Sequence, residues 1–245
     1  MRIAVVTDVH ANLAALEAVL RHAEGERALD AVWALGDLVG YGPQPSACLA
    51  RLRGLPLTAV AGNHDLAAAG AIDLRQFNTT AADASRWTAA QLSDEDKAFL
   101  LSLPRTLVVE PFSLAHGSLR DPIWEYLITR IAALAQFDRM ETPFSMVGHT
   151  HVPLLFAESD DPWEPRHELL YDGDVVQLGE TRLILNPGGV GQPRDGDPRA
   201  AYAVYDAGET TVTFHRVPYE VALTQAAMAE AGLPASLIAR LGRGR

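Results

Sequence analysis

The stretch MRIAVVTDVHANLAALEAVLRHAE, residues 1 to 24, sets the fold class of this chain. Residues 1 to 8 form a short apolar run that ends on Asp8, as a buried strand does. Asn12 is a suitable N-cap for the following segment, in which apolar residues recur at helical spacing. The chain therefore opens with a β-α unit.

The same alternation continues along the first half. AVWALGD (31–37) predicts a strand ending at Asp37, a glycine- and proline-rich loop follows, and LTAVAG (57–62) predicts a strand ahead of Asn63. Residues 79 to 103 are expected to be helical, with Ser93 and Asp96 as a capping pair. Strands that alternate with helices favour an α/β layered fold.

The second half is rich in strand signals. A helix is expected near 125–138 and an exposed loop at 159–167, where the sequence is polar and contains prolines. Strands are expected at 106–110, 112–117, 144–151, 152–158, 174–179, 181–186, 200–206 and 210–217. These strands suggest a second sheet packed on the first. We expect one domain over residues 1–240, a two-sheet sandwich flanked by helices, and then a frayed, solvated basic tail, 241–245.

Composition limits the possible functions. The single cysteine, Cys48, cannot form an internal disulfide or a thiolate metal site. The net charge of −11 opposes non-specific binding to nucleic acid or anionic lipid. Since no apolar stretch is long enough for a signal peptide or membrane span, we expect a cytoplasmic protein. An anionic substrate would need a local positive site, and the oligomeric state stays open.

Polar clusters occur where five apolar strands end: DVH at 8–10, GD at 36–37, GNHD at 62–65, HG at 116–117 and GHTH at 148–151. Ligands of layered α/β folds bind at the carboxyl ends of strands, so these clusters are expected to converge. Imidazole, carboxylate and amide oxygen suit two divalent ions of Mn, Fe, Zn or Ni. Ligands two residues apart, such as Asp8 and His10, should project to one side of an extended chain.

Each cluster taken alone has an ordinary structural explanation. His116 alone would be a hydrogen-bonded buried histidine, and Asp37 alone a turn or helix cap. The metal-site hypothesis rests on their joint position at strand ends. The other histidines, His22, His167 and His215, lie outside the clusters and are interpreted as surface or structural residues.

The motif set resembles that of the calcineurin-like metallophosphoesterase superfamily, whose pattern is D-x-H, G-D, G-N-H-[DE], H and G-H-x-H in this order. More narrowly, it is similar to YfcE-like phosphodiesterases and dinucleoside polyphosphate hydrolases. The resemblance implies an αββα sandwich with two metal ions. Their ligands would be Asp8, His10 and His151 for one ion, Asn63, His116 and His149 for the other, and Asp37 between them.

The resemblance also implies that His64 faces the substrate, as a proton donor to the leaving group or a hydrogen-bond donor to phosphoryl oxygens. Two metal ions would promote in-line attack of hydroxide on phosphorus. One feature departs from the phosphoprotein phosphatases, because Val39-Gly40-Tyr41 stands where they carry an arginine. Arg120, Arg194 or Arg199 could replace it, and Tyr41 could stack on a base, although each has an ordinary explanation as a loop residue.

We therefore expect hydrolysis of phosphodiesters or phosphoanhydrides of small nucleotides. Dinucleoside polyphosphate hydrolysis, phosphomonoester hydrolysis and phosphoprotein dephosphorylation stay as alternatives. A binding scaffold without catalysis is the non-enzymatic alternative, and it predicts missing ligands or a missing His64, which this sequence retains.

Overall fold

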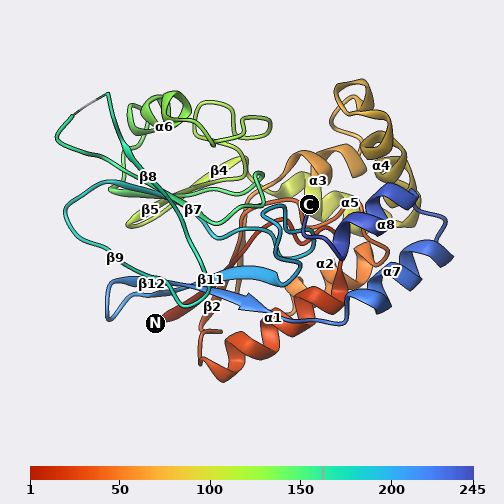
Figure 1. The fold of residues 1–245 in the computed structure, drawn as a ribbon. Helices are drawn as coiled ribbons and strands as arrows, with labels where there is room; N and C mark the ends of the chain where they lie inside the picture. Colours follow the sequence, from red (N-terminus) through yellow and green to blue (C-terminus); the bar gives the residue numbers. More distant parts are fainter. Residues whose placement is uncertain (162) are drawn as a thin grey trace.

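Two mixed six-stranded sheets form the centre of the molecule (Figure 1). The computed structural model describes residues 1–161 and 163–245. The first sheet has the order β3 (Leu57–Ala59), β2 (Ala31–Ala34), β1 (Arg2–Val6), β11 (Ala200–Asp206), β12 (Thr211–Val217) and β9 (Val175–Gln177). The second has the order β4 (Thr106–Val109), β5 (Phe112–Ala115), β6 (Phe144–Met146), β10 (Leu183–Asn186), β7 (Leu154–Ala157) and β8 (Arg166–Leu169).

The alternation of side chains along β1 separates the layers of the core. Ile3 and Val5 point into the cluster between the two sheets. Ala4 and Val6 point the other way, into a cluster with α1 (Leu13–Gly25) and α2 (Pro45–Arg53). A third cluster joins the outer face of the second sheet to α6 (Arg130–Phe137). The layers follow the order helix, sheet, sheet, helix, which confirms the predicted single-domain sandwich.

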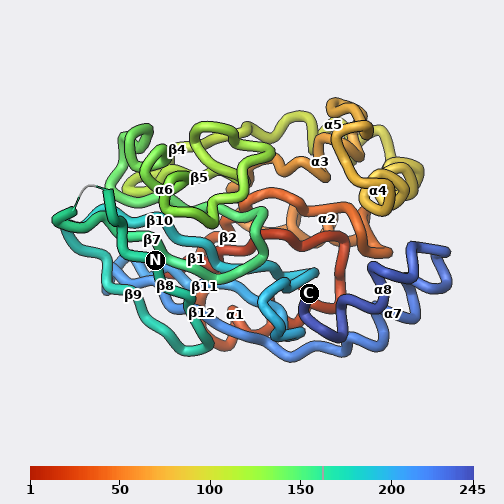
Figure 2. Tube along the Cα trace, turned by 45° about the horizontal axis from the view of Figure 1, so that its top comes forward, coloured from red at the N-terminus to blue at the C-terminus, as the bar shows by residue number. Residues whose placement is uncertain are grey.

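The remaining helices gather at one end of the sheets. They are α3 (Asn63–Ala68), the short η1 (Leu74–Gln76), α4 (Thr79–Gln91), α5 (Asp94–Ser102), α7 (Val221–Glu230) and α8 (Ala235–Leu241). Figures 1 and 2 both show α4, α7 and α8 together at this end. Strands β1, β2 and β3 run parallel, as do β5, β6 and β10, so the carboxyl ends of each set share one edge. No helix in the described residues combines the length and hydrophobicity that crossing a membrane requires.

Several boundaries differ from those expected from the sequence. The helical segment 79–103 is two helices, because Leu92 is extended and the Ser93–Asp96 capping box starts a new helix. The strands of the second half do not form one sheet: β11 pairs antiparallel with β1, and β12 and β9 extend that first sheet. The expected loop 159–167 ends inside β8, an exposed edge strand that tolerates polar residues; residue 162 lies outside the described residues.

The expectation of a frayed C-terminal tail was wrong. Leu241 is buried in a cluster with Tyr41 and the helices α4 and α7. The backbone N–H of Gly196 donates to the carbonyl oxygen of Gly244 over 2.8 Å. The last residues are therefore docked against the loop that precedes β11.

Candidate metal centre

The predicted convergence of the polar clusters is present. Asp8 and His10 follow β1, Asp37 follows β2, Asn63 begins α3, His116 follows β5, and His149 and His151 follow β6. All seven side chains are buried, with at most 3% of their surface exposed. Two sets of ligand atoms, those of Asp8, His10 and His151 and those of Asp37, His116 and His149, each lie within 4.8 Å of one another.

The backbone reaches this arrangement in a way that differs from the expected extended chain. Asp8, His10, His149 and His151 all have left-handed backbone conformations, with φ between 47° and 66°. Such a conformation costs a non-glycine residue roughly 1–2 kcal/mol. Main-chain hydrogen bonds hold it, such as those from Asp8 N–H to the Gly36 carbonyl and from His10 N–H to the Asp37 carbonyl. Asp8 and His10 belong to one ligand set, whereas His149 and His151 belong to different sets.

A close approach of the loops after β2 and β3 requires glycine at position 62. A Cβ atom there would lie 2.1 Å from Asp37 Oδ1. The approach allows the backbone N–H of His64 to donate to Asp37 Oδ1 over 2.8 Å. Asp65 joins the same loops by accepting hydrogen bonds from the N–H groups of Val39 and Gly62. The backbone N–H of His64 thus orients the Asp37 carboxylate.

Hydrogen bonds assign the tautomers in the first ligand set. His10 Nδ1 lies 3.2 Å from the carbonyl oxygen of Val39, and His151 Nδ1 lies 2.6 Å from that of Gln192. Because a carbonyl only accepts, each Nδ1 carries the proton, and the neutral ring then presents a lone pair at Nε2. The two Nε2 atoms face each other at 3.3 Å. Two lone pairs so close repel, so this geometry calls for a cation between them.

Asp8 adds a negative charge to the same place. Burial would raise the pKa of Asp8, but the neighbouring His151 holds it well below its usual range. Burial keeps His10 and His151 neutral by lowering their pKa values. Oδ1 of Asp8 is buried and accepts no hydrogen bond within the described structure, although His151 Nε2 lies 3.1 Å away. One carboxylate oxygen and two neutral imidazoles fit a divalent transition metal.

The second ligand set surrounds His116. Its Nδ1 lies 2.8 Å from the Leu35 carbonyl oxygen, so Nε2 faces Asn63 Oδ1 at 3.2 Å, His149 Nδ1 at 2.9 Å and Asp37 Oδ2 at 3.3 Å. Burial lowers the pKa of His116, but Asp37 outweighs it and raises the pKa to about 9. His116 is therefore protonated and positively charged when no metal is bound. A divalent ion can replace this proton.

Asp37 lies between the two sets. Its Oδ2 is 3.7 Å from His10 Nε2 in the first set and 3.3 Å from His116 Nε2 in the second. Burial would raise the pKa of Asp37, but His116 and His64 hold it well below the usual range. The carboxylate is therefore charged and positioned to contact ions on both sides.

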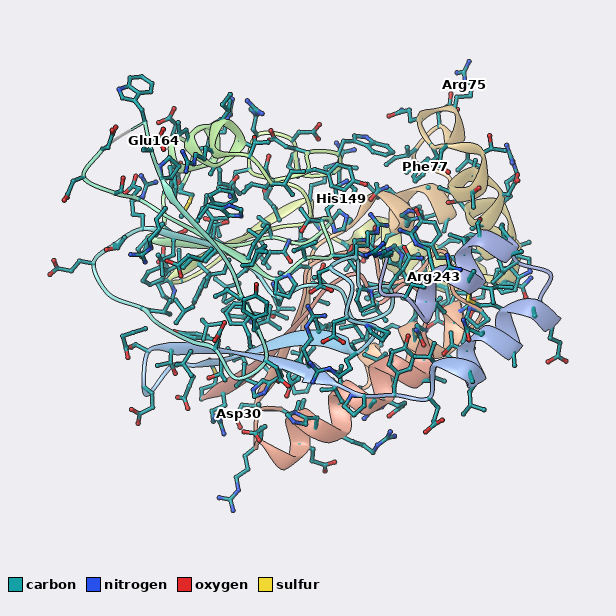
Figure 3. All side chains as sticks on the ribbon, in the orientation of Figure 1. Asp30, Arg75, Phe77, His149, Glu164 and Arg243 are labelled. Atoms are coloured by element: carbon teal, nitrogen blue, oxygen red, sulfur yellow. The ribbon has the colours of Figure 1, made fainter. Side chains whose placement is uncertain are left out.

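A cavity of about 180 Å³ opens above these ligands. His64 lines it, packed 4.2 Å from the Tyr41 ring and 5.0 Å from the Phe77 ring, measured between centroids. Tyr126 stacks on His149 with centroids 4.0 Å apart and Trp124 contacts Phe77. In Figure 3, His149 is labelled near the centre of the molecule and Phe77 toward the end where α4 lies; both line the cavity. The cavity thus has a floor of candidate metal ligands and walls of aromatic rings.

Comparison with known proteins identifies this arrangement. Residues 1–210 match the sequence pattern of the calcineurin-like phosphoesterase superfamily domain. The chain belongs to this superfamily. It is accordingly a hydrolase that acts on phosphate esters.

Two relatives that match over nearly the whole chain support this assignment, and a third matches over part of it. A crystal structure of a metallophosphoesterase from Sphaerobacter thermophilus is 46% identical, with a TM-score of 0.91 and coverage of 100% of this chain and 99% of that one. An uncharacterized protein of Methanocaldococcus jannaschii, MJ0912, is 34% identical over 99% of this chain and 98% of its own length. A symmetrical bis(5'-nucleosyl)-tetraphosphatase from Vibrio cholerae is 28% identical, but over 66% of this chain and 59% of its own.

The structure separates the three arginines considered in place of the phosphatase arginine. Arg194 lines the cavity; one of its terminal nitrogens donates to Gln192 Oε1, and its buried Nε has no acceptor within the described residues. Arg120 is paired with Glu125 and Arg199 with Asp197 and Asp172, and neither lines this cavity. Of these three arginines, Arg194 is the one that lines the cavity.

Sequence reasoning missed most of the aromatic wall. Phe77, Trp124 and Tyr126 lie in segments between regular elements, where no periodic pattern shows which way a side chain points. A usable signal is the pair of aromatic residues beside one motif: Trp124 and Tyr126 follow His116 by eight and ten residues. Asp65 was quoted within GNHD but given no role, and it joins two of the ligand loops.

Proposed function

We propose that this protein hydrolyses phosphodiesters or phosphoanhydrides of small nucleotides with two divalent metal ions. The facing Nε2 atoms of His10 and His151, at 3.3 Å with both Nδ1 atoms committed to carbonyls, carry the metal part of this proposal. Asp8, His10 and His151 would hold one ion, Asn63, His116 and His149 the other, and Asp37 both. When bound, the ions supply Lewis acidity toward phosphoryl oxygens and lower the pKa of water.

The protein's own groups would position the substrate around this centre. Arg194 can donate two parallel hydrogen bonds to phosphate oxygens, because a guanidinium presents its N–H groups as a planar fork. Burial lowers the pKa of His64 to about 4, although Asp37 acts in the opposite direction. His64 is therefore neutral near pH 7 in the metal-free protein, and its ring N–H can donate to a phosphoryl or leaving-group oxygen.

The shape of the cavity supports the choice of substrate. Tyr41, Phe77, Trp124 and Tyr126 provide ring faces on which a base or aryl group can stack. A cavity of about 180 Å³ with these walls suits a small substrate better than a phosphorylated loop of a folded protein. The loop Val39-Gly40-Tyr41 also lacks the arginine that would favour phosphoprotein monoesters.

The test is a comparison of kcat/KM in Mn²⁺ for a dinucleoside tetraphosphate, bis(p-nitrophenyl) phosphate and a phosphothreonine peptide. The first two are expected to exceed the peptide. A peptide that is preferred by tenfold or more would contradict the proposed substrate class. Metal-dependent turnover would still be intact in that case.

A further inference from the structure

A second cavity, of about 270 Å³, lies beside the first. The two share Tyr41, Asn78 and Ala81 in their linings. The second cavity is also lined by Ser236, Leu237 and Arg240 of α8, which do not line the first. A ligand that extends from the metal centre past Tyr41 would therefore meet the C-terminal helix.

The position of α8 is fixed by packing. Leu237 and Leu241 lie in one buried cluster with Tyr41 and Ala81, so the helix is packed on the residues shared by both cavities. The hydrogen bond from Gly196 N–H to the Gly244 carbonyl also ties the chain end to the loop that carries Arg194. Arg240 and Arg194 therefore face the cavities from anchored segments.

The two arginines concentrate positive charge in an acidic protein. Arg194 lines the first cavity and Arg240 lines the second, which shares residues with it. Burial lowers the pKa of Arg240, and the positive charge of Arg194 acts in the same direction. Neither forms an ion pair with an Asp or Glu in the parts of the chain that the structure describes. Arg240 Nε donates to the main-chain oxygen of Arg245, the last residue, and a terminal nitrogen of Arg194 donates to Gln192 Oε1. Two half-buried cations that no Asp or Glu side chain of the described residues neutralises favour an anionic ligand.

We propose that Arg240, together with Arg194, binds a second phosphate group of the substrate, beyond the one placed at the metal centre. The inference rests on the proposed function, because it takes the first phosphate to lie over the metal ligands. It makes the C-terminal helix part of the binding site and selects substrates with two or more linked phosphate groups.

The experiment compares a ligand with two phosphorus centres to one with a single centre. Methylene bisphosphonate and inorganic phosphate are measured as inhibitors of bis(p-nitrophenyl) phosphate hydrolysis in Mn²⁺. Arg240→Met removes the charge but keeps most of the apolar stem. We expect Arg240→Met to raise the Ki of the bisphosphonate by a factor at least about ten times larger than the factor by which it raises the Ki of phosphate. A tenfold change corresponds to the loss of one charge-assisted hydrogen bond. Arg240→Lys should restore part of this selectivity, because lysine keeps the charge without the fork.

The matched control is Arg243→Met, an exposed arginine three residues on that lines neither cavity (Figure 3). It should leave both inhibition constants unchanged. An equal effect of Arg240→Met on both inhibitors would show a structural role for Arg240 and overturn the inference. So would an unchanged Ki for the bisphosphonate.

A calorimetric titration separates failure of this inference from failure of the proposed function. Both ligands are titrated into the wild type and Arg240→Met in Mn²⁺ buffer, with no turnover required. If the wild type hydrolyses no ester, the proposed function has failed; a preference for bisphosphonate that Arg240→Met reduces tenfold would still support the subsite. Equal preference in both proteins would overturn it.

Discussion

The floor and the rim of the cavity are built differently. The floor residues follow strands or begin α3, are at most 3% exposed, and are oriented largely by backbone carbonyl or N–H groups. The rim residues Tyr41, Tyr126 and Arg194 lie in loops, and Tyr126 is 48% exposed. The floor therefore depends on the main chain of both sheets. The rim touches the floor through side chains, as where Tyr126 stacks on His149 and Tyr41 packs against His10.

This difference separates the residues proposed to carry out the reaction from those proposed to select the substrate. Groups that hold metal must keep their positions to a fraction of an ångström, which the sheets provide. Groups that contact the rest of the substrate only add binding energy. Substitutions in the floor should therefore reduce turnover of every ester, whereas substitutions in the rim should change the ranking of substrates.

The largest effect is expected for Asp37→Ala in the floor. Loss of the carboxylate between the two ligand sets should lower activity at least about 10³-fold, since metal-ion stabilisation amounts to several kcal/mol. Elemental analysis should show less metal than in the wild type. Asp83→Ala, an exposed position on α4, serves as the control and should keep both. Two tightly bound ions in Asp37→Ala would contradict the assignment of Asp37.

His64→Ala lies at the boundary of floor and rim. It should retain metal but lose about 10²-fold in kcat, as is typical when a proton or hydrogen-bond donor to the transition state is removed. A neutral His64 that donates a hydrogen bond to phosphoryl oxygens should give the same loss for esters of p-nitrophenol and for alkyl esters. A smaller loss for p-nitrophenol, whose leaving group needs no proton, would show instead that His64 acts as the general acid.

Arg194→Met tests the rim. Its kcat/KM for phosphate esters should fall about tenfold to 100-fold, because a hydrogen bond to a charged group contributes roughly 1.5–3 kcal/mol. Arg120→Met and Arg199→Met remove guanidinium groups that already pair with carboxylates, so both should stay near the wild type. A larger loss in either of them than in Arg194→Met would contradict the choice of Arg194.

The smallest effect is expected for the aromatic wall. Tyr126→Ala should raise KM for a dinucleoside polyphosphate about tenfold, within the ~1–3 kcal/mol typical of base stacking. Inorganic tripolyphosphate, which has no base, should be hydrolysed with an unchanged KM. Tyr171→Ala, another exposed tyrosine outside the cavity, is the control. Equal changes for both substrates would show that Tyr126 acts through His149, on which it stacks.

The floor could be predicted from sequence because its signal is local. Asp8 and Asp37 each end an apolar run, and His149 stands two residues past another, so the motif marks both the residue and the strand that places it. Their left-handed backbones could not be predicted, because hydrogen bonds between loops far apart in sequence stabilise them. The family resemblance, and not the spacing of the residues, predicts the division of His149 and His151 between two ligand sets, and the structure shows the same division.

The rim could not be predicted in the same way. Tyr126 and Arg194 lie in loops whose side chains have no periodic direction, and Arg240 reaches the cavity only because α8 packs against Tyr41. The placement of β11 beside β1 was missed for a related reason. Pairing between strands that are distant in sequence depends on which strand edges of a sheet remain unpaired. The residue pattern of one strand does not show this.

The central claim, a floor that holds two ions for phosphoester hydrolysis, is tested most directly by titrating metal-free protein with Mn²⁺. Binding is followed by calorimetry, and hydrolysis of bis(p-nitrophenyl) phosphate is measured in parallel. We predict that two ions bind per chain and that activity appears as the second site fills. Full activity without a divalent metal, or saturation of both signals at a single ion, would contradict the account.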